Sequence, residues 1–123
     1  MLQVQRWDAE RDGVLTASRV RQRFEAQGLW VSEGRFQPGG RLVSPGTGHD
    51  QLQVVLSGLM KVTIAGDSAI LAAGDALFMP RGTDSTLEVV GSTPVVAYFA
   101  AFLPNAPRVS RSTQPDLTST VWR

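Results

Sequence analysis

The sequence predicts an all-β domain in which short antiparallel strands form a sandwich or barrel. Apolar and polar side chains alternate over residues 51–56 and again over 60–64, which is the two-residue period of a strand with one buried face. Turn residues separate these runs, for example at Ser57-Gly58. A further run ends at Pro80, which has no N–H to donate to a sheet. Short strands at this spacing are typical of sandwiches and barrels.

Length, charge and cysteine content limit the class of protein. A chain of 123 residues has the length of one domain and buries roughly two-thirds of its unfolded surface, enough for one core. The net charge of +1 provides no bulk field that would attract nucleic acid or a membrane, so we expect neither as a partner. Met1 is not followed by a charged and then apolar leader, and no apolar run reaches the length of a membrane span. Because the chain also has no cysteine, we expect a cytoplasmic protein without disulfides.

Residues 1–28 are expected to form a strand and a helix ahead of the barrel. Residues 2–5 alternate like a short strand, and residues 8–13 are polar and turn-like. Thr16 is a good helix N-cap and Gly28 stands where a C′ glycine would, so the spacing predicts one short helix between them. The apolar stripe of this helix consists of Ala17, Val20 and Phe24.

Three arginines occupy the remaining faces of this helix and raise the question of nucleic-acid binding. They are Arg19, Arg21 and Arg23, and Glu25 lies nearby. A solvated helix face with mixed charges is the ordinary case for such a pattern. We therefore expect no nucleic-acid interface here.

The barrel itself is expected to span residues 29–103. Residues 29–36 read as its first strand, and residues 95–103, the most apolar run of the chain, read as its last. Residues 104–123 are rich in Ser, Thr, Pro and Arg and hold too little apolar surface to pack alone. We expect this segment to be a flexible or partner-docking tail.

Two stretches within residues 29–102 resemble the motifs of the cupin family, a small β-barrel of jelly-roll type. Residues 51–58, Gln-Leu-Gln-Val-Val-Leu-Ser-Gly, resemble the second half of the first motif, in which a His-x-His pair precedes a Glu or Gln and an apolar strand ending in Gly. Residues 74–85 resemble the second motif, Gly-Asp, an apolar strand and Pro-x-Gly-x-x-His, except at its last position. The resemblance implies a cupin-type antiparallel β-barrel or jelly roll with one short N-terminal helix. It says little about function, because this fold carries many.

The metal-binding positions of the family are substituted in this sequence. The two His positions of the first motif fall on Pro45 and Thr47, its carboxylate position on Gln51, and the His position of the second motif on Ser85. None of these is a good ligand for a divalent transition metal, which prefers imidazole and carboxylate. His49 is the only histidine, so the resemblance carries no metal site, and we expect no metal and no cofactor.

The candidate ligand-binding residues are those that the resemblance places near the barrel interior. Gln51 and Gln53 share strand parity, and the family position of Gln51 implies that both face inward. Two buried amides need hydrogen-bond partners, which a polar ligand could supply. Alternatively they bond to each other, to a nearby hydroxyl or to trapped water. The full candidate set is His49, Gln51, Gln53, Ser85 and Tyr98, and for Tyr98 core packing with a satisfied hydroxyl is the default interpretation.

His49 decides between two functions. The first is a metal-free cupin-like protein that binds a small polar molecule in its barrel, as a sensor, carrier or accessory module. The second is a metal-independent isomerase, epimerase or lyase that uses His49 as the catalytic acid or base, with Asp50 orienting it. Neighbouring strand residues point to opposite faces, which makes that pairing poor unless a loop relaxes it. A His49 that points into the barrel favours catalysis, and a subunit whose barrel is filled by side chains is a third interpretation.

The ends of the chain are the basis for an expectation about assembly. Residues 2–5 and 105–123 lie outside the predicted barrel and could cross to a second copy. Uncovered sheet edges invite pairing between chains. We therefore expect a homodimer.

Overall fold

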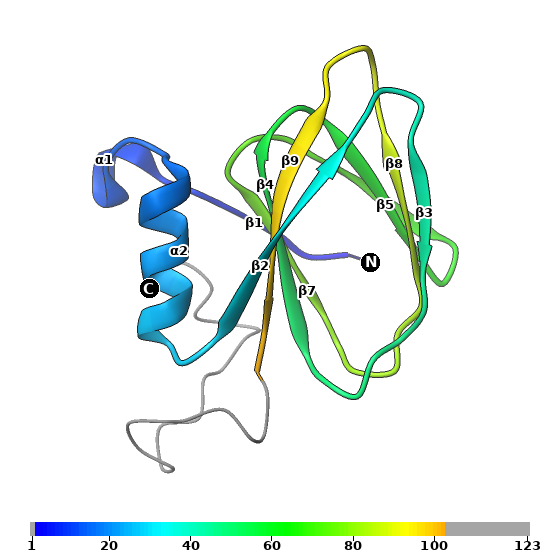
Figure 1. The fold of residues 1–123 in the computed structure, drawn as a ribbon, viewed down its shortest axis with the longest axis horizontal. Coiled ribbons are helices and arrows are strands. Elements are labelled where there is room, and N and C mark those ends of the chain that lie inside the picture. Colours follow the sequence, from blue (N-terminus) through cyan, green and yellow to red (C-terminus); the bar gives the residue numbers. More distant parts are fainter. Residues whose placement is uncertain (1, 103–123) are drawn as a thin grey trace.

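The computed structural model describes residues 2–102, which fold into two facing antiparallel sheets with helices on one side (Figure 1). The first sheet has the strand order β1 (Val4–Arg6), β7 (Asp75–Met79), β4 (Gln51–Ser57), β9 (Val95–Ala101) and β2 (Trp30–Phe36). The second has the order β3 (Arg41–Ser44), β8 (Ser85–Val89), β5 (Met60–Ile64) and β6 (Asp67–Leu71). The predicted all-β, jelly-roll-like fold is confirmed, although the two sheets do not join into one closed barrel. The predicted tail, 104–123, lies outside the described residues.

The central strand β4 is buried on both faces, and this divides the core in two. Leu52 and Val54 lie in a cluster with Val20 and Phe24 of the helix that covers the outer face of the first sheet. Val55 lies in a second cluster between the two sheets, together with residues of both sheets: Met60, Val62, Leu71, Leu77, Leu87, Val95 and Ala97. Because side chains alternate along a strand, Gln51 and Gln53 share the inward direction of Val55. Their interior parity agrees with the prediction for these two amides.

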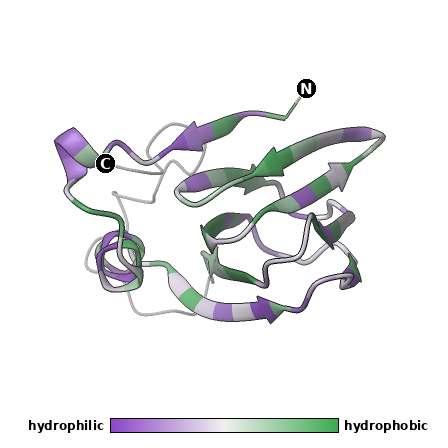
Figure 2. Cartoon of the chain, turned by 90° about the horizontal axis from the view of Figure 1, so that it is seen from above, coloured by the Kyte–Doolittle hydropathy of each residue, from purple (hydrophilic) through white to green (hydrophobic). Residues whose placement is uncertain are grey.

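The helix α2 (Ala17–Ala26) forms where the sequence predicts it. The Thr16 hydroxyl accepts a hydrogen bond from the Arg19 backbone N–H at 3.1 Å, and Gly28 has a φ of 81°, in the left-handed region that suits a C′ glycine. Figure 2, which looks nearly along this helix, shows hydrophilic and hydrophobic residues on different sides of it. No helix within residues 2–102 is both long and apolar enough to cross a membrane.

A second, shorter helix corrects the expectation of a single one. Residues 9–12 form the one-turn helix α1 (Ala9–Asp12), where the sequence analysis expected only a turn. The Asp8 carboxylate caps it by accepting from the backbone N–H groups of Glu10 and Arg11, at 3.0 and 3.4 Å. An aspartate at an N-cap stabilises even one turn of helix, because it pairs N–H groups that the turn leaves open.

The N-terminal strand is paired within its own chain. β1 runs antiparallel to β7, with Val4 opposite Leu77 and Arg6 opposite Asp75. The strand thus begins two residues later than predicted and covers an edge of the first sheet. The segment that was expected to be spare for a second copy is therefore used inside this chain.

Candidate functional site

Gln53 and Ser85 place two polar atoms inside the sandwich that have no partner within residues 2–102. The side chain of Gln53 lies between Leu77 and Phe99 in the register of the first sheet, and the residue is only 1% exposed. Ser85 is 3% exposed and shares the inward parity of Leu87 on the facing sheet. Within the described residues, neither Gln53 Oε1 nor Ser85 Oγ has a hydrogen-bond partner, and both atoms are buried.

The topology brings both residues to the same end of the sandwich. β4 begins at Gln51, which lies opposite Met79 at the end of β7. The chain then passes through residues 80–84 and enters β8 at Ser85. Gln51, half-buried and inward by parity, belongs to the same end. Three of the predicted site residues are thus brought together.

Two loops, residues 45–50 and 80–84, meet at this end of the sandwich. Gly46 N donates to the Asp84 carboxylate at 2.7 Å, and Gly82 N donates to the Thr47 carbonyl at 2.8 Å. A Cβ on Gly46 would lie 2.5 Å from the Gly82 carbonyl carbon, so only a glycine allows the loops to come this close. We call this contact, made by Gly46 and the Thr47 carbonyl between the family's first two histidine positions and the loop after β7, the backbone clamp.

His49 lies in the first of these loops without a carboxylate to orient it. Its backbone N–H donates to the Thr47 hydroxyl at 3.3 Å, and its carbonyl accepts from the same hydroxyl at 3.0 Å. Its Nδ1 is buried and has no partner among residues 2–102. The neighbouring Asp50 carboxylate instead accepts from the Arg81 backbone N–H at 2.9 Å and lies 3.8 Å from Arg81 Nε. Among the described residues no contact joins the His49 and Asp50 side chains, in line with the poor geometry expected for neighbouring strand residues.

Tyr98 lies on the opposite face of the first sheet from Gln53. It belongs to the outer cluster under α2, and the Arg21 guanidinium carbon lies 5.1 Å from the centre of its ring. Along β9, Ala97 lies in the inner cluster and Phe99 packs against it, so the residue between them faces out. The structure therefore does not bring Tyr98 together with the interior candidates.

The residues at the family's metal positions do not fit a divalent transition metal. Pro45, Thr47, Gln51 and Ser85 offer no imidazole and no carboxylate. Within residues 2–102, no three His, Asp or Glu side chains gather closely enough to hold an ion. The nearby carboxylates of Asp50 and Asp84 are already bonded to backbone N–H groups.

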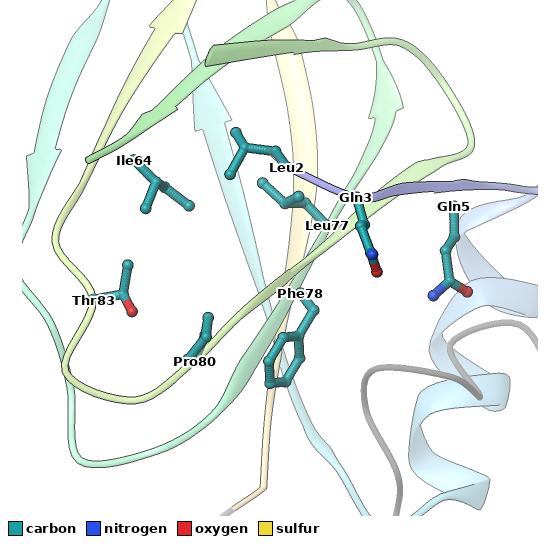
Figure 3. A pocket seen from close by; sticks show the side chains of 8 residues that line it. All are labelled: Leu2, Gln3, Gln5, Ile64, Leu77, Phe78, Pro80 and Thr83. Atoms are coloured by element: carbon teal, nitrogen blue, oxygen red, sulfur yellow. The ribbon is translucent and has the colours of Figure 1, made fainter. Parts of the chain in front are cut away.

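A side pocket of about 300 Å³ adjoins the interior site and was missed by sequence reasoning (Figure 3). It lies where the N-terminal segment, the end of β5, β7 and the turn after β7 meet. Segments this distant in sequence are brought together only by the fold, and no motif marks them. The lining side chains are Leu2, Gln3, Gln5, Ile64, Leu77, Phe78, Pro80 and Thr83.

The arginines of α2 are engaged within the chain. Arg23 Nη2 lies 2.5 Å from an Asp12 carboxylate oxygen, and Arg19 Nη1 donates to the Val14 carbonyl at 2.9 Å. Arg21 lies over Tyr98 and 3.7 Å from Glu25. Each of these three arginines therefore has a partner on the chain itself.

Comparisons with known proteins agree with this architecture. The model of the cupin domain family matches residues 32–101. Among solved structures, the cupin domain of a transcriptional regulator of the XRE family from Enterobacter cloacae has a TM-score of 0.58 and 17% identity, over 85% of this chain and 98% of that one. A cupin protein from Bacteroides fragilis has a TM-score of 0.56 and 20% identity, over 69% and 74%. A protein of unknown function from Rhizobium leguminosarum has a TM-score of 0.55 and 22% identity, over 60% and 69%.

These similarities extend to the fold and no further. A salicylate 1,2-dioxygenase from Pseudaminobacter salicylatoxidans also matches, with a TM-score of 0.54 and 18% identity, but only 20% of its length is covered. One fold therefore carries proteins with different names, as expected for a common scaffold. No curated protein matches the sequence.

Proposed function

The chain belongs to the cupin family, whose model matches residues 32–101 of its 123 residues, and from this premise we propose that it binds a small polar molecule between its two sheets without a metal ion. A sensor, carrier or accessory module needs such a pocket and no further chemistry. The observation that carries the proposal is that Gln53 Oε1 and Ser85 Oγ are buried and have no hydrogen-bond partner in the part of the chain that the structure describes.

The burial of Gln53 Oε1 and Ser85 Oγ is evidence for a bound ligand. A buried polar group without a partner costs about 1–3 kcal/mol of stability, so such groups are rare unless something pairs with them. An apolar side chain of similar size would fill either position without that cost. A molecule with both donors and acceptors would pair with the Gln53 carbonyl and the Ser85 hydroxyl at once, since the hydroxyl both donates and accepts.

Binding is better supported than catalysis. A general base needs an orienting partner and a position within reach of the substrate. The Asp50 carboxylate is bonded to Arg81, and within residues 2–102 no histidine or lysine side chain hydrogen-bonds to the Ser85 hydroxyl. The isomerase, epimerase or lyase alternative therefore has less support, because among the described residues no carboxylate is paired with His49.

The ligand proposal is tested by a thermal-shift screen of small polar molecules against the wild type and Gln53→Leu. A molecule that binds the native state raises the melting temperature. We expect hits that stabilise the wild type and the exposed control Gln37→Leu but leave Gln53→Leu unchanged. Ser85→Ala, compared with the exposed Ser92→Ala, should weaken the same hits. Hits that stabilise Gln53→Leu as strongly as the wild type would contradict binding at the interior site.

We further propose that the protein is a homodimer. The outer face of the second sheet exposes Val43 and Ile70, at 61% and 56%, next to polar neighbours, and this face is open among the described residues. Sedimentation equilibrium at micromolar concentration should give twice the chain mass of 13.3 kDa. Val43→Lys with Ile70→Lys should lower that mass if this face is the contact, whereas Val14→Lys, an exposed site near the helices, serves as control. A wild-type mass of one chain would exclude the dimer.

A further inference from the structure

The side pocket exists because the pairing of β1 with β7 stops before the end of β7. Pairing between the two strands ends at Val4 and Leu77, while β7 continues to Met79. Leu2 and Gln3 diverge from β7 (Figure 3), so within residues 2–102 no strand pairs with Phe78 and Met79 on that side. Residues along a strand present their N–H and C=O alternately to the two neighbours. One backbone donor and acceptor pair of Phe78 or Met79 therefore lies on the side that β1 leaves uncovered.

The lining of the pocket carries no charge. Five of the eight side chains are apolar, and Gln3, Gln5 and Thr83 are polar but neutral. A charged ligand would lose its hydration on entry and would meet no opposite charge among these residues. A volume of about 300 Å³ lies at the small end of the range for ligand sites. The neutral lining and the small volume of the pocket together favour a small, uncharged ligand.

The polar groups present here suit a ligand that both donates and accepts. The Gln3 side-chain amide, the Thr83 hydroxyl and a β-strand edge each offer a donor beside an acceptor. An amide-like group on the ligand matches that pattern, and its apolar part would rest on Leu2, Ile64 and Leu77. Leu77 lies opposite Gln53 in the sheet register, so the pocket adjoins the interior site.

We propose that the side pocket binds a small uncharged molecule that carries an amide-like donor and acceptor next to an apolar group. The proposal rests on the ligand-binding function proposed above, and adds a second ligand site that adjoins the interior one, together with the class of ligand it takes. It does not involve His49 or a metal ion.

The test is an NMR titration of the ¹⁵N-labelled full chain with benzamide, benzoate and benzylamine at neutral pH. These three probes share one ring and nearly one shape, but only benzamide is uncharged. We expect a dissociation constant of about 1–10 mM for a probe of this size. We expect benzamide to shift the backbone signals of Leu77, Phe78 and Thr83, and the two ions to shift them at least tenfold less.

Two matched substitutions locate the effect. Thr83→Phe places a ring in the pocket and should weaken benzamide binding at least tenfold. Thr86→Phe makes the same change on the outer face of the second sheet, opposite Thr63, and should leave binding unchanged. A folded state for each variant is established from the dispersion of the same spectra. Because Gln3 is exposed and outside the core, Gln3→Ala gives a second, milder variant and should weaken binding measurably.

The outcomes separate this inference from the function on which it rests. Equal shifts with benzoate or benzylamine would overturn the uncharged class. Shifts confined to Gln53 and Ser85 and insensitive to Thr83→Phe would overturn the pocket while supporting the interior site. The absence of any benzamide-dependent shift would overturn this inference alone, because the thermal-shift screen with Gln53→Leu decides the interior function independently.

Discussion

Gly46 lies at the point where the two loops of the candidate site touch. A Cβ at this position would come within 2.8 Å of the Gly82 Cα and the Thr83 N, and both neighbours are backbone atoms that cannot rotate away. The hydrogen bond from Gly46 N to Asp84 fixes the same contact from the other side. Because Gly46 has no side chain, the two loops can meet at this point and form the backbone clamp. The clamp lies at the positions that the family's first motif gives to histidines.

Gly46→Ala should destabilise the protein by about 1–3 kcal/mol, the usual cost of forcing extra atoms into a packed site. Gly48→Ala is the matched control, because a Cβ there meets nothing within 4 Å. The control should leave the free energy of unfolding unchanged or raise it by up to about 1 kcal/mol, since alanine restricts the unfolded chain. Urea denaturation measures both. Equal effects of the two substitutions would show that the loops do not meet as described.

At the scale of elements, Asp12 joins α1 to α2. Its carboxylate accepts from Arg11 Nη2 at 3.0 Å and from Arg23 Nη2 at 2.5 Å, and the Arg23 guanidinium lies 5.3 Å from the ring centre of Trp7. Hydrogen bonding to Arg11, and then to Arg23, lowers the pKa of the Asp12 carboxyl from 3.8 to about 2. The one-turn helix is thereby held against the helix that covers the sheet.

This lowered pKa predicts how stability depends on pH. Because the folded-state pKa of Asp12 is below its ordinary value, its contribution is present above about pH 4 and is lost as the pH falls toward about 2. The difference in urea midpoint between the wild type and Asp12→Asn should therefore be largest near neutral pH and should close over that interval. Glu25→Gln removes an exposed pair with Arg21 and should give a small difference at every pH. A wild-type advantage over Asp12→Asn that persists at pH 2 would contradict the pairing.

Strand periodicity predicted the sheets well but could not assign every face. Both faces of β4 carry buried apolar residues, Leu52 and Val54 on one and Val55 on the other. Only the family position of Gln51 indicated which face points between the sheets. Tyr98 lies in a strand that is apolar on both sides, so periodicity alone could not separate it from its inward neighbour Phe99. The one-turn helix depends on a single cap at Asp8. The side pocket depends on where β1 leaves β7, which no local pattern encodes.

At the scale of the whole molecule, this chain keeps the family's fold and lacks the family's metal ligands. A stable transition-metal site needs about three protein ligands of suitable type. The relevant positions hold Pro45, Thr47, Gln51 and Ser85, and the nearby carboxylates pair with backbone N–H groups. His49 could add one nitrogen, but a site with one such ligand would lose its ion to water and buffer.

The purified protein should therefore contain no stoichiometric iron, manganese, nickel or zinc. Elemental analysis after dialysis without a chelator measures this directly. Metal also stabilises a folded state that binds it, so divalent ions should leave the melting temperature unchanged. His49→Ala is the decisive variant: one metal per chain in the wild type, absent from His49→Ala, would mean that the loop at residues 45–50 rearranges around an ion. In that case the backbone clamp at Gly46 would have to open, and Gly46→Ala would then change metal content as well as stability.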